Sequence, residues 1–375
     1  MKRLGDIAAV LLLGLLCAAL WIAPSPPPVT TQEGVARRAR VLEVDDSGVA
    51  VHGLLKFGTQ RLKVGMLDGP HRGRTFRAVN EIRAQMDLDK HFAPGDQAVV
   101  IERGDEDPAA DTLVARDHWR FGWAATLFLG FCALLCMFGG WTGVKALFSF
   151  LFSCLVVWKG VIPLALRGWP ASWTSFAAVC LLSAVIMYLV AGLTRKGLVA
   201  FLGTALGVFA GLAMAHLFGR MMHINGATMP YVQTLLYSGY EFLDLQDIFI
   251  GAMALASSGA VMDLAMDIAS GMEEIVRHRP DVPRRELLLS GVRIGRSVVG
   301  TMTTTLLLAY SGGYITLLMA FAAQGTNPLD IVNSTLVSAE LVKTLIGSFS
   351  LVLVAPFTAF VGAGVFAGKG EGAAG

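Results

Sequence analysis

The chain has 375 residues, of which 54% are hydrophobic and 15% are charged, and its net charge is +2. Soluble domains carry about 25% charged residues, so the composition excludes an ordinary soluble protein and indicates an integral membrane protein. The near-zero net charge gives no support to a role in binding nucleic acid. All five cysteines lie within apolar runs, so we expect neither a disulfide framework nor a metal site: Cys17, Cys132, Cys136, Cys154 and Cys180.

The first element is an apolar run over residues 7–23, which follows Lys2 and Arg3. A cleaved signal peptide has this kind of start. We expect an uncleaved anchor over residues 1–23 instead, because Trp21 and the proline-rich residues 24–28 replace the small residues of a cleavage site. Seven further runs approach the roughly 20 residues that span a bilayer. They cover residues 122–140, 144–166, 173–193, 198–219, 248–268, 294–321 and 341–366.

These runs predict a mainly α fold, a polytopic membrane helix bundle with about eight transmembrane helices. Seven of them form a bundle over residues 121–366, and residues 367–375 form a tail. Basic residues in short loops predict the orientation. Most of them fall on one side if eight helices alternate, whereas Arg167 and Arg220 disagree. We expect that side to be the cytoplasm, with both termini inside.

Residues 30–118, between the first two helices, have a β pattern and should form an extracytoplasmic domain. Short alternating segments at residues 61–66, 75–79, 97–102 and 112–115 are separated by turn sequences. Four to six short strands in so few residues suggest a small barrel, which would be OB-like. Such barrels can bind nucleic acid, but residues 37–117 hold 13 Lys and Arg against 14 Asp and Glu, so we exclude that role.

The most informative residues are two acids on the helix expected at residues 248–268. Asp263 and Asp267 are four residues apart and therefore lie on one helix face. The same face continues through Gly259, Ala256 and Ala252, which are small. Small residues let a neighbouring helix approach closely, so we expect both carboxylates inside the bundle.

The next helix begins with two basic residues on one face. Arg293, Arg296 and Gly300 follow with helical spacing, and Arg296 should lie at the depth of Asp267, so we predict an ion pair between them. Asp263 then remains without a cationic partner, among hydroxyls that include Thr301 and Thr305. Such a carboxylate can bind Na⁺ or carry a proton. The alternative is that both acids only lock the helix hairpin.

Three further features complete the candidate site. Glu340 and Lys343 lie near the outer end of the last helix, where snorkelling or a gating role for Glu340 would explain them. Pro356 should free a carbonyl and kink that helix, while Gly259 and Gly300 are candidate packing or hinge positions. Residues 229–243 are apolar but too short to span, so we expect an interfacial or re-entrant helix with Glu241, Asp244 and Asp247 nearby.

These motifs resemble the YibE/F-like family of multi-pass bacterial membrane proteins over nearly the whole chain. The segments that carry the resemblance are GTQRLKVGMLDGPHRGRTF, FAPGDQAVV, LTRK with LGTALGV, MPYVQTLLYSGY, GAVMD-x-AMDIAS, SG-x-x-IGR-x-x-x-GTM-x-x-TL-x-LAY, SAELVKTLIGS and APFTAF. The resemblance implies an N-terminal anchor, an extracytoplasmic β-domain, a seven-helix bundle and a location in the bacterial plasma (inner) membrane. It implies no assigned function beyond loose suggestions of efflux. The polar positions of its pattern are Asp263, Asp267, Arg296, Gly300, Thr301, Thr305 and Glu340.

The leading hypothesis is a secondary transporter or channel for an ion or small solute, with Asp263 as the coupling or substrate carboxylate. The alternative is a non-transporting sensor or assembly scaffold that uses its extracytoplasmic domain. An intramembrane aspartyl protease is disfavoured, because Asp263 and Asp267 share one helix. We therefore expect no enzyme activity and no cofactor. The expected partners are the lipid bilayer and the solute or ion. Further copies of the chain, in a homo-oligomer, are a partner that the sequence leaves open.

Overall fold

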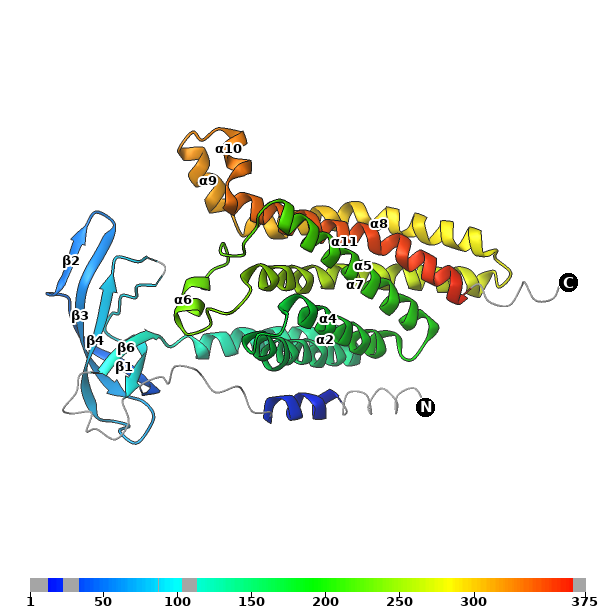
Figure 1. Cartoon of the computed structure of the whole chain (residues 1–375). Helices are drawn as coiled ribbons and strands as arrows, with labels where there is room; N and C mark the ends of the chain where they lie inside the picture. The colour runs from blue at the N-terminus through cyan, green and yellow to red at the C-terminus, as the bar shows by residue number, and fades with distance from the viewer. Residues whose placement is uncertain (1–12, 23–33, 87, 103–112, 367–375) are drawn as a thin grey trace. The chain divides into compact units, whose positions relative to one another are not determined.

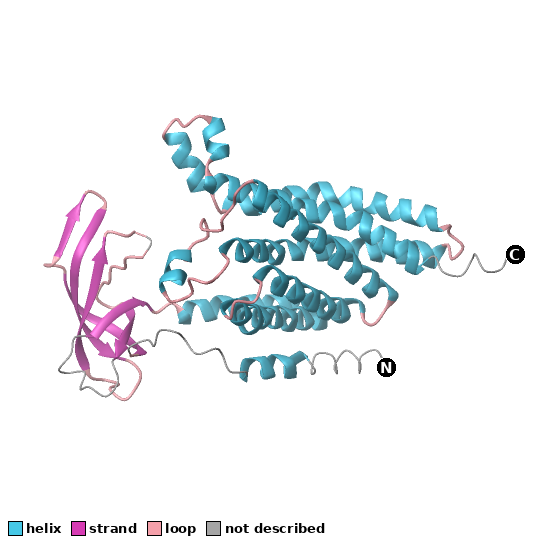
Figure 2. Ribbon diagram, in the orientation of Figure 1, coloured by secondary structure: helices cyan, strands magenta, loops and turns pink. Residues whose placement is uncertain are grey.

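The computed structural model describes residues 13–22, 34–86, 88–102 and 113–366, which form two compact units. One unit comprises residues 28–140, and the other comprises residues 1–27 and 141–375. The start of the expected anchor and the expected tail, residues 367–375, lie outside the described residues. All of the described strands belong to the first unit, and helices make up most of the chain (Figure 2).

Six strands form the β-structure of the first unit. They are β1(Val35–Asp45), β2(Val49–His52), β3(Leu55–Met66), β4(Thr75–Arg83), β5(Gln97–Glu102) and β6(Leu113–His118). Their order in the sheet is β1-β5-β6-β4-β3-β2, and β1 also pairs with β3. Five strands therefore close into a barrel, and β2 extends β3 as a hairpin. The small barrel predicted from the strand pattern is confirmed, and its five strands match the number in an OB fold.

Alternation along each strand fills the interior of the barrel. In β4, Phe76, Ala78, Asn80 and Ile82 are buried, and the residues before and after each of them are more exposed. Successive side chains of a strand point to opposite faces, so this alternation directs one set inward. The four short segments that the sequence predicts as strands correspond to β3, β4, β5 and β6.

Two buried amides hold the segment after β4 against the barrel. Gln60 accepts hydrogen bonds from the backbone N–H of Phe92, at 3.0 Å, and from Nδ2 of Asn80, at 3.2 Å. Its Nε2 donates to the Phe92 carbonyl at 3.0 Å and to Oδ1 of Asp46 at 2.8 Å. Asn80 donates in turn to the carbonyl of Lys90 at 2.7 Å. These bonds replace the strand pairing that the segment lacks.

We expect Gln60→Leu to open this segment, because several buried partners would lose their hydrogen bonds. Each unsatisfied buried group costs roughly 1–3 kcal/mol. Hydrogen–deuterium exchange of the full-length protein should show faster exchange at residues 90–96. The control is Gln85→Leu, at an exposed position. Unchanged exchange in Gln60→Leu would contradict this role.

The second unit is helical. A short helix covers Leu13–Ile22. The further helices are α2(Phe121–Val156), the π-helix η1(Val157–Val161), α3(Ile162–Leu166), α4(Ala171–Ala191), α5(Arg195–Met221), α6(Val232–Tyr237), α7(Leu245–His278), α8(Arg284–Gly312), α9(Ile315–Ala323), α10(Pro328–Asn333) and α11(Thr335–Phe366). The long helices α5, α7, α8 and α11 run side by side (Figure 1). α2 begins in the first unit and enters the second after Gly140, whose backbone is not helical (φ 51°, ψ −129°).

Several helices are apolar and long enough to cross a membrane, but the prediction of eight is not confirmed. Five of the described helices qualify, or six if α8 and α9, which meet at an angle of 64°, count as one bent span. The expected spans at residues 122–140 and 144–166 lie on either side of Gly140, where a non-helical backbone kinks the 46-residue stretch Phe121–Leu166. The expected span at residues 294–321 is bent where α8 ends and α9 begins.

Small residues allow the central helices to pack closely. A Cβ at Gly203, Gly207 or Gly211 of α5 would lie 2.1, 2.8 or 1.8 Å from a side-chain atom of α11. On α8, a Cβ at Gly291 or Gly295 would lie within 3 Å of α11 in the same way. Van der Waals packing of small residues is a main source of helix association in membranes, so these contacts organise the unit.

Candidate functional site

α7 lies at the centre of the helical unit and has one open face. It packs against α4, α5, α8 and α11. The exposed residues along its remaining face, here called the α7 stripe, are Ala252, Ala256, Gly259, Asp263 and Asp267. The helix also continues to His278, past the expected end at residue 268, so Asp267 and Asp263 lie about 16 and 22 Å from its last residue. The two carboxylates therefore share one face, as predicted.

The prediction that these carboxylates lie inside the bundle is wrong for the single chain, because Asp263 and Asp267 are both exposed. The exposed face of α5 has a different composition: Leu202, Leu206, Phe209 and Leu217. Those side chains suit a lipid environment, whereas an ionised side chain at bilayer depth costs several kcal/mol. The α7 stripe therefore requires water, an ion or another protein surface beside it.

Hydroxyls of α8 lie on the side of that helix that faces α7. A Cβ at Gly271 of α7 would lie 2.7 Å from Cδ1 of Ile294. Thr301 and Thr305 come seven and eleven residues after Ile294, so at 3.6 residues per turn they lie on the same side of α8. Each hydroxyl donates to its own helix, Thr301 to the Val298 carbonyl at 2.9 Å and Thr305 to the Thr301 carbonyl at 3.0 Å. Their oxygen lone pairs remain available to a cation or a donor.

The two helices also match in depth. A Cβ at Gly295 of α8 would lie 3.2 Å from Cδ1 of Ile268. Because the helices are antiparallel and rise equally per residue, Asp263 lies at the level of Thr301. The nearby hydroxyls of Ser257 and Ser258 do not belong here, because both are buried and donate to carbonyls of α7 itself. The structure thus places Asp263, on the exposed face of α7, at the depth of Thr301 on α8, with Asp267 and Thr305 each one turn away along their own helices.

The predicted ion pair between Asp267 and Arg296 is not formed. Arg296 comes two residues after Ile294, which places it about 160° from Ile294 around α8 by the shorter way, and it therefore projects from the side away from α7. In the described part of the chain, neither acid of the α7 stripe has an ion-pair partner, and neither do Arg293 and Arg296. Asp267 and Arg296 do lie at equal depth, but the Arg296 side chain points away from α7 and the pair cannot form within one chain.

Glu340 lies apart from these acids and is paired within its own helix. Nζ of Lys343 donates to both carboxylate oxygens, at 2.7 and 2.8 Å, and both side chains are about three-quarters buried. The same region holds the buried hydroxyl of Tyr310, which has no hydrogen-bond partner among the described residues. α11 continues as one helix through Pro356 to Phe366, with Pro356 on its exposed side.

The expected interfacial helix at residues 229–243 is represented by the short α6, and the acids after it cap other helices. Oδ1 of Asp244 accepts from the N–H of Asp247 at 3.1 Å, which caps α7. Oδ2 of Asp247 accepts from the N–H of Ser172 at 3.0 Å, in the first turn of α4. Both acids therefore have structural partners.

We expect Asp247→Ala to lower the stability of the helical unit by about 1–2 kcal/mol, because α4 would lose its capping carboxylate. Thermal unfolding of the full-length protein in detergent would measure the change. Glu241→Ala is the matched control, since Glu241 is an exposed acid of the same segment. Equal unfolding temperatures for the two variants would contradict the capping role.

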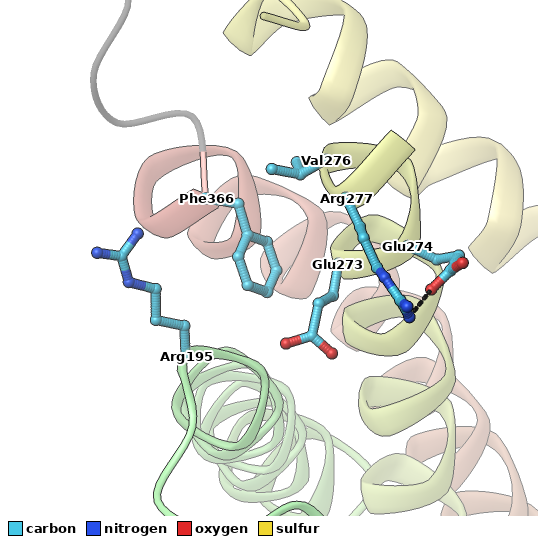
Figure 3. A pocket seen from close by; sticks show the side chains of 6 residues that line it. All are labelled: Arg195, Glu273, Glu274, Val276, Arg277 and Phe366. Carbon is cyan, nitrogen blue, oxygen red and sulfur yellow. Dashed lines mark ion pairs between the residues drawn. The ribbon is translucent and has the colours of Figure 1, made fainter. Parts of the chain in front are cut away.

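A cavity that the sequence did not predict lies where α5 begins and α7 and α11 end. Its volume is about 460 Å³, and its lining consists of Arg195, Glu273, Glu274, Val276, Arg277 and Phe366 (Figure 3). Arg277 pairs with Glu274 at 3.7 Å, and Lys196 pairs with Glu273 at 3.5 Å. The sequence did not predict this cavity, because its four α7 residues lie in the helical turns beyond the expected end at residue 268.

The match with known proteins covers the helical part of the chain. A family model described as YibE/F-like protein matches residues 127–368, which include the α7 stripe, Thr301, Thr305 and Glu340. No curated protein and no solved structure matches the chain at a significant level.

Proposed function

The chain belongs to the YibE/F-like family, and from this premise we propose that it moves an ion or a small solute across a membrane, with Asp263 as the coupling or substrate carboxylate. The observation that carries the proposal is the exposure of Asp263 and Asp267 on an apolar helix without a cationic partner among the described residues. An acid that is costly to hold in lipid usually marks a pathway or a binding site.

The chemistry beside Asp263 supports a cation or a proton as the coupled species. Two carboxylates and the hydroxyls of Thr301 and Thr305 supply only oxygen atoms, which hard cations prefer. The threonine protons are already donated to carbonyls, so their lone pairs can face a cation. The same carboxylates can carry protons when no metal ion is bound.

The proposed setting is the bacterial plasma membrane, with both termini in the cytoplasm and residues 30–118 outside. The basic residues of the short loops support this orientation. In this arrangement the cavity at the ends of α5, α7 and α11 belongs to the cytoplasmic side.

A flux screen tests the proposal. Proteoliposomes with the wild-type protein and empty liposomes would be compared under imposed proton, Na⁺ and K⁺ gradients, with a panel of cations and small metabolites. We expect protein-dependent flux of at least one of them, driven by one gradient. Absence of flux across the whole panel, from protein that is folded and monodisperse, would count against transport.

A second candidate function, a sensor or scaffold, draws on one feature of the barrel. A cavity of about 180 Å³ lies between the start of β3 and the segment after β4. Its lining combines exposed apolar side chains, Leu54, Leu55 and Met86, with Lys56 and Lys90. Binding of a ligand there without any flux would favour this alternative.

A further inference from the structure

Two helix faces of the unit have compositions that do not suit lipid, and both are exposed in the described part of the chain. The first is the α7 stripe. The second, here called the α8 stripe, consists of Arg293, Arg296, Gly300, Thr304 and Leu307, which are all exposed. Neither Gly259 nor Gly300, the glycines of these stripes, would place a Cβ within 4 Å of a described atom beyond its own helical turn. The packed glycines Gly207 and Gly295 would each meet a neighbour within 3 Å.

The two stripes are complementary in charge. The α7 stripe carries two carboxylates and the α8 stripe two guanidinium groups, and none of the four has an ion-pair partner in the described ranges. Arginine and carboxylate form the strongest, bidentate kind of ion pair. Each stripe therefore supplies the partner that the other lacks.

The stripes also match in register when two copies lie parallel in one membrane. Within the chain, Met272 of α7 lies against Gly291 of α8, and Ile268 of α7 lies against Gly295 of α8. The helices are antiparallel, so a step of four residues toward the start of α7 changes the depth as much as a step of four residues toward the end of α8. When a second copy lies at the same depth, its Arg296 is opposite Asp267 of the first copy. Its Gly300 is then opposite Asp263, and its Thr304 is opposite Gly259. A glycine thus faces each larger residue in the middle of the contact, which permits close approach of the helices.

A single chain cannot make this contact, because the α8 stripe points away from α7. Arg296 lies about 160° from Ile294, the residue that touches α7. We propose that the α7 stripe of one copy packs against the α8 stripe of a second copy, with Asp267 and Arg296 paired across the boundary. The two surfaces differ, so the interface is heterologous and joins copies head to tail, in a ring where the rotation between neighbours closes. Arg296 of the second copy then completes the surroundings of the Asp263–Asp267 pair.

Charge-swapped chains test this pairing between copies, and the readout is the oligomer mass from native mass spectrometry in detergent. Wild type should be oligomeric. D267R and R296D alone should each reduce association by at least about a hundredfold, because like charges in contact cost several kcal/mol. Co-expression of the D267R chain with the R296D chain should restore association, since each boundary between the two kinds of chain then joins opposite charges.

The co-expression separates pairing between chains from pairing within one. If Asp267 and Arg296 paired within a chain, only the double variant D267R/R296D would recover, and the mixture would not. That result, or a monomeric wild type, would overturn the proposal. The control swap is D330R, on the exposed acid of α10, and it should leave the oligomer mass unchanged.

Disulfide cross-linking in native membranes tests the geometry and does not depend on any transport activity. The five native cysteines would be replaced by alanine, and Ala256→Cys would be combined with a differently tagged chain that carries Leu307→Cys, its level partner. We expect oxidation to link these chains, and Leu206→Cys on the lipid-type face of α5 to give no link with Leu307→Cys. Links between two Ala256→Cys chains, without links to Leu307→Cys, would overturn the head-to-tail contact.

Discussion

Proteoliposomes with Asp263→Asn should move the coupled ion or solute about 10- to 150-fold more slowly than wild type, because a charge-assisted contact contributes roughly 1.5–3 kcal/mol. Asparagine keeps the size of the side chain and removes its charge and its capacity to carry a proton. Asp263 is exposed on the α7 stripe and has no paired cation in the described chain, so no neighbour takes over either role.

The matched control is Asp330→Asn, which removes an equally exposed acid from α10. Its flux should stay at the wild-type level, and Asp263→Glu should recover part of the flux. Full flux in Asp263→Asn would show that this carboxylate is not the coupling group. Loss in Asp267→Asn alone would move that role one turn along α7. Because the oligomer mass is measured separately, a failure of transport and a failure of assembly can be distinguished.

Gly207→Leu should prevent stable packing of the helical unit, which is the largest structural effect that we expect from a single substitution. A Cβ at this position would lie 2.8 Å from Cβ of Val354 on α11 and 3.2 Å from Cγ1 of Val261 on α7. Three helices meet there, so none can move without disturbing another. Overpacking of this kind costs about 1–3 kcal/mol and sometimes more.

Thermal unfolding in detergent, followed by tryptophan fluorescence, would report this loss, together with the yield of monodisperse protein. Gly130→Leu is the control, because among the described residues a Cβ at Gly130 of α2 meets no atom within 4 Å beyond its own helical turn. Leucine also has a higher helix propensity than glycine, so that variant should be at least as stable as wild type. If Gly207→Leu unfolded at the wild-type temperature, α5, α7 and α11 would not pack as described.

Local patterns were sufficient to predict the elements. Alternation of side chains over residues 61–66 and 97–102 predicted strands that the barrel contains, because strand periodicity depends only on neighbours in sequence. Long apolar runs predicted membrane-length helices for the same reason. The number of spans is not confirmed: a kink at Gly140 separates two expected spans within one helical stretch, and one expected span bends at Gly312–Tyr314. Whether a helix continues past a glycine depends on contacts that sequence spacing does not contain.

Of the candidate site, too, the sequence predicted one part and the tertiary packing decided the other. Residue spacing alone placed Asp263 and Asp267 on one face with Ala252, Ala256 and Gly259, and it placed Arg296 at the depth of Asp267, because helix geometry sets angle and rise per residue. Which faces are covered was decided by the packing of α4, α5, α8 and α11 around α7. That packing leaves the acids exposed and turns Arg296 away from them. The direction in which a helix face points is set by its neighbours, which come from distant parts of the chain.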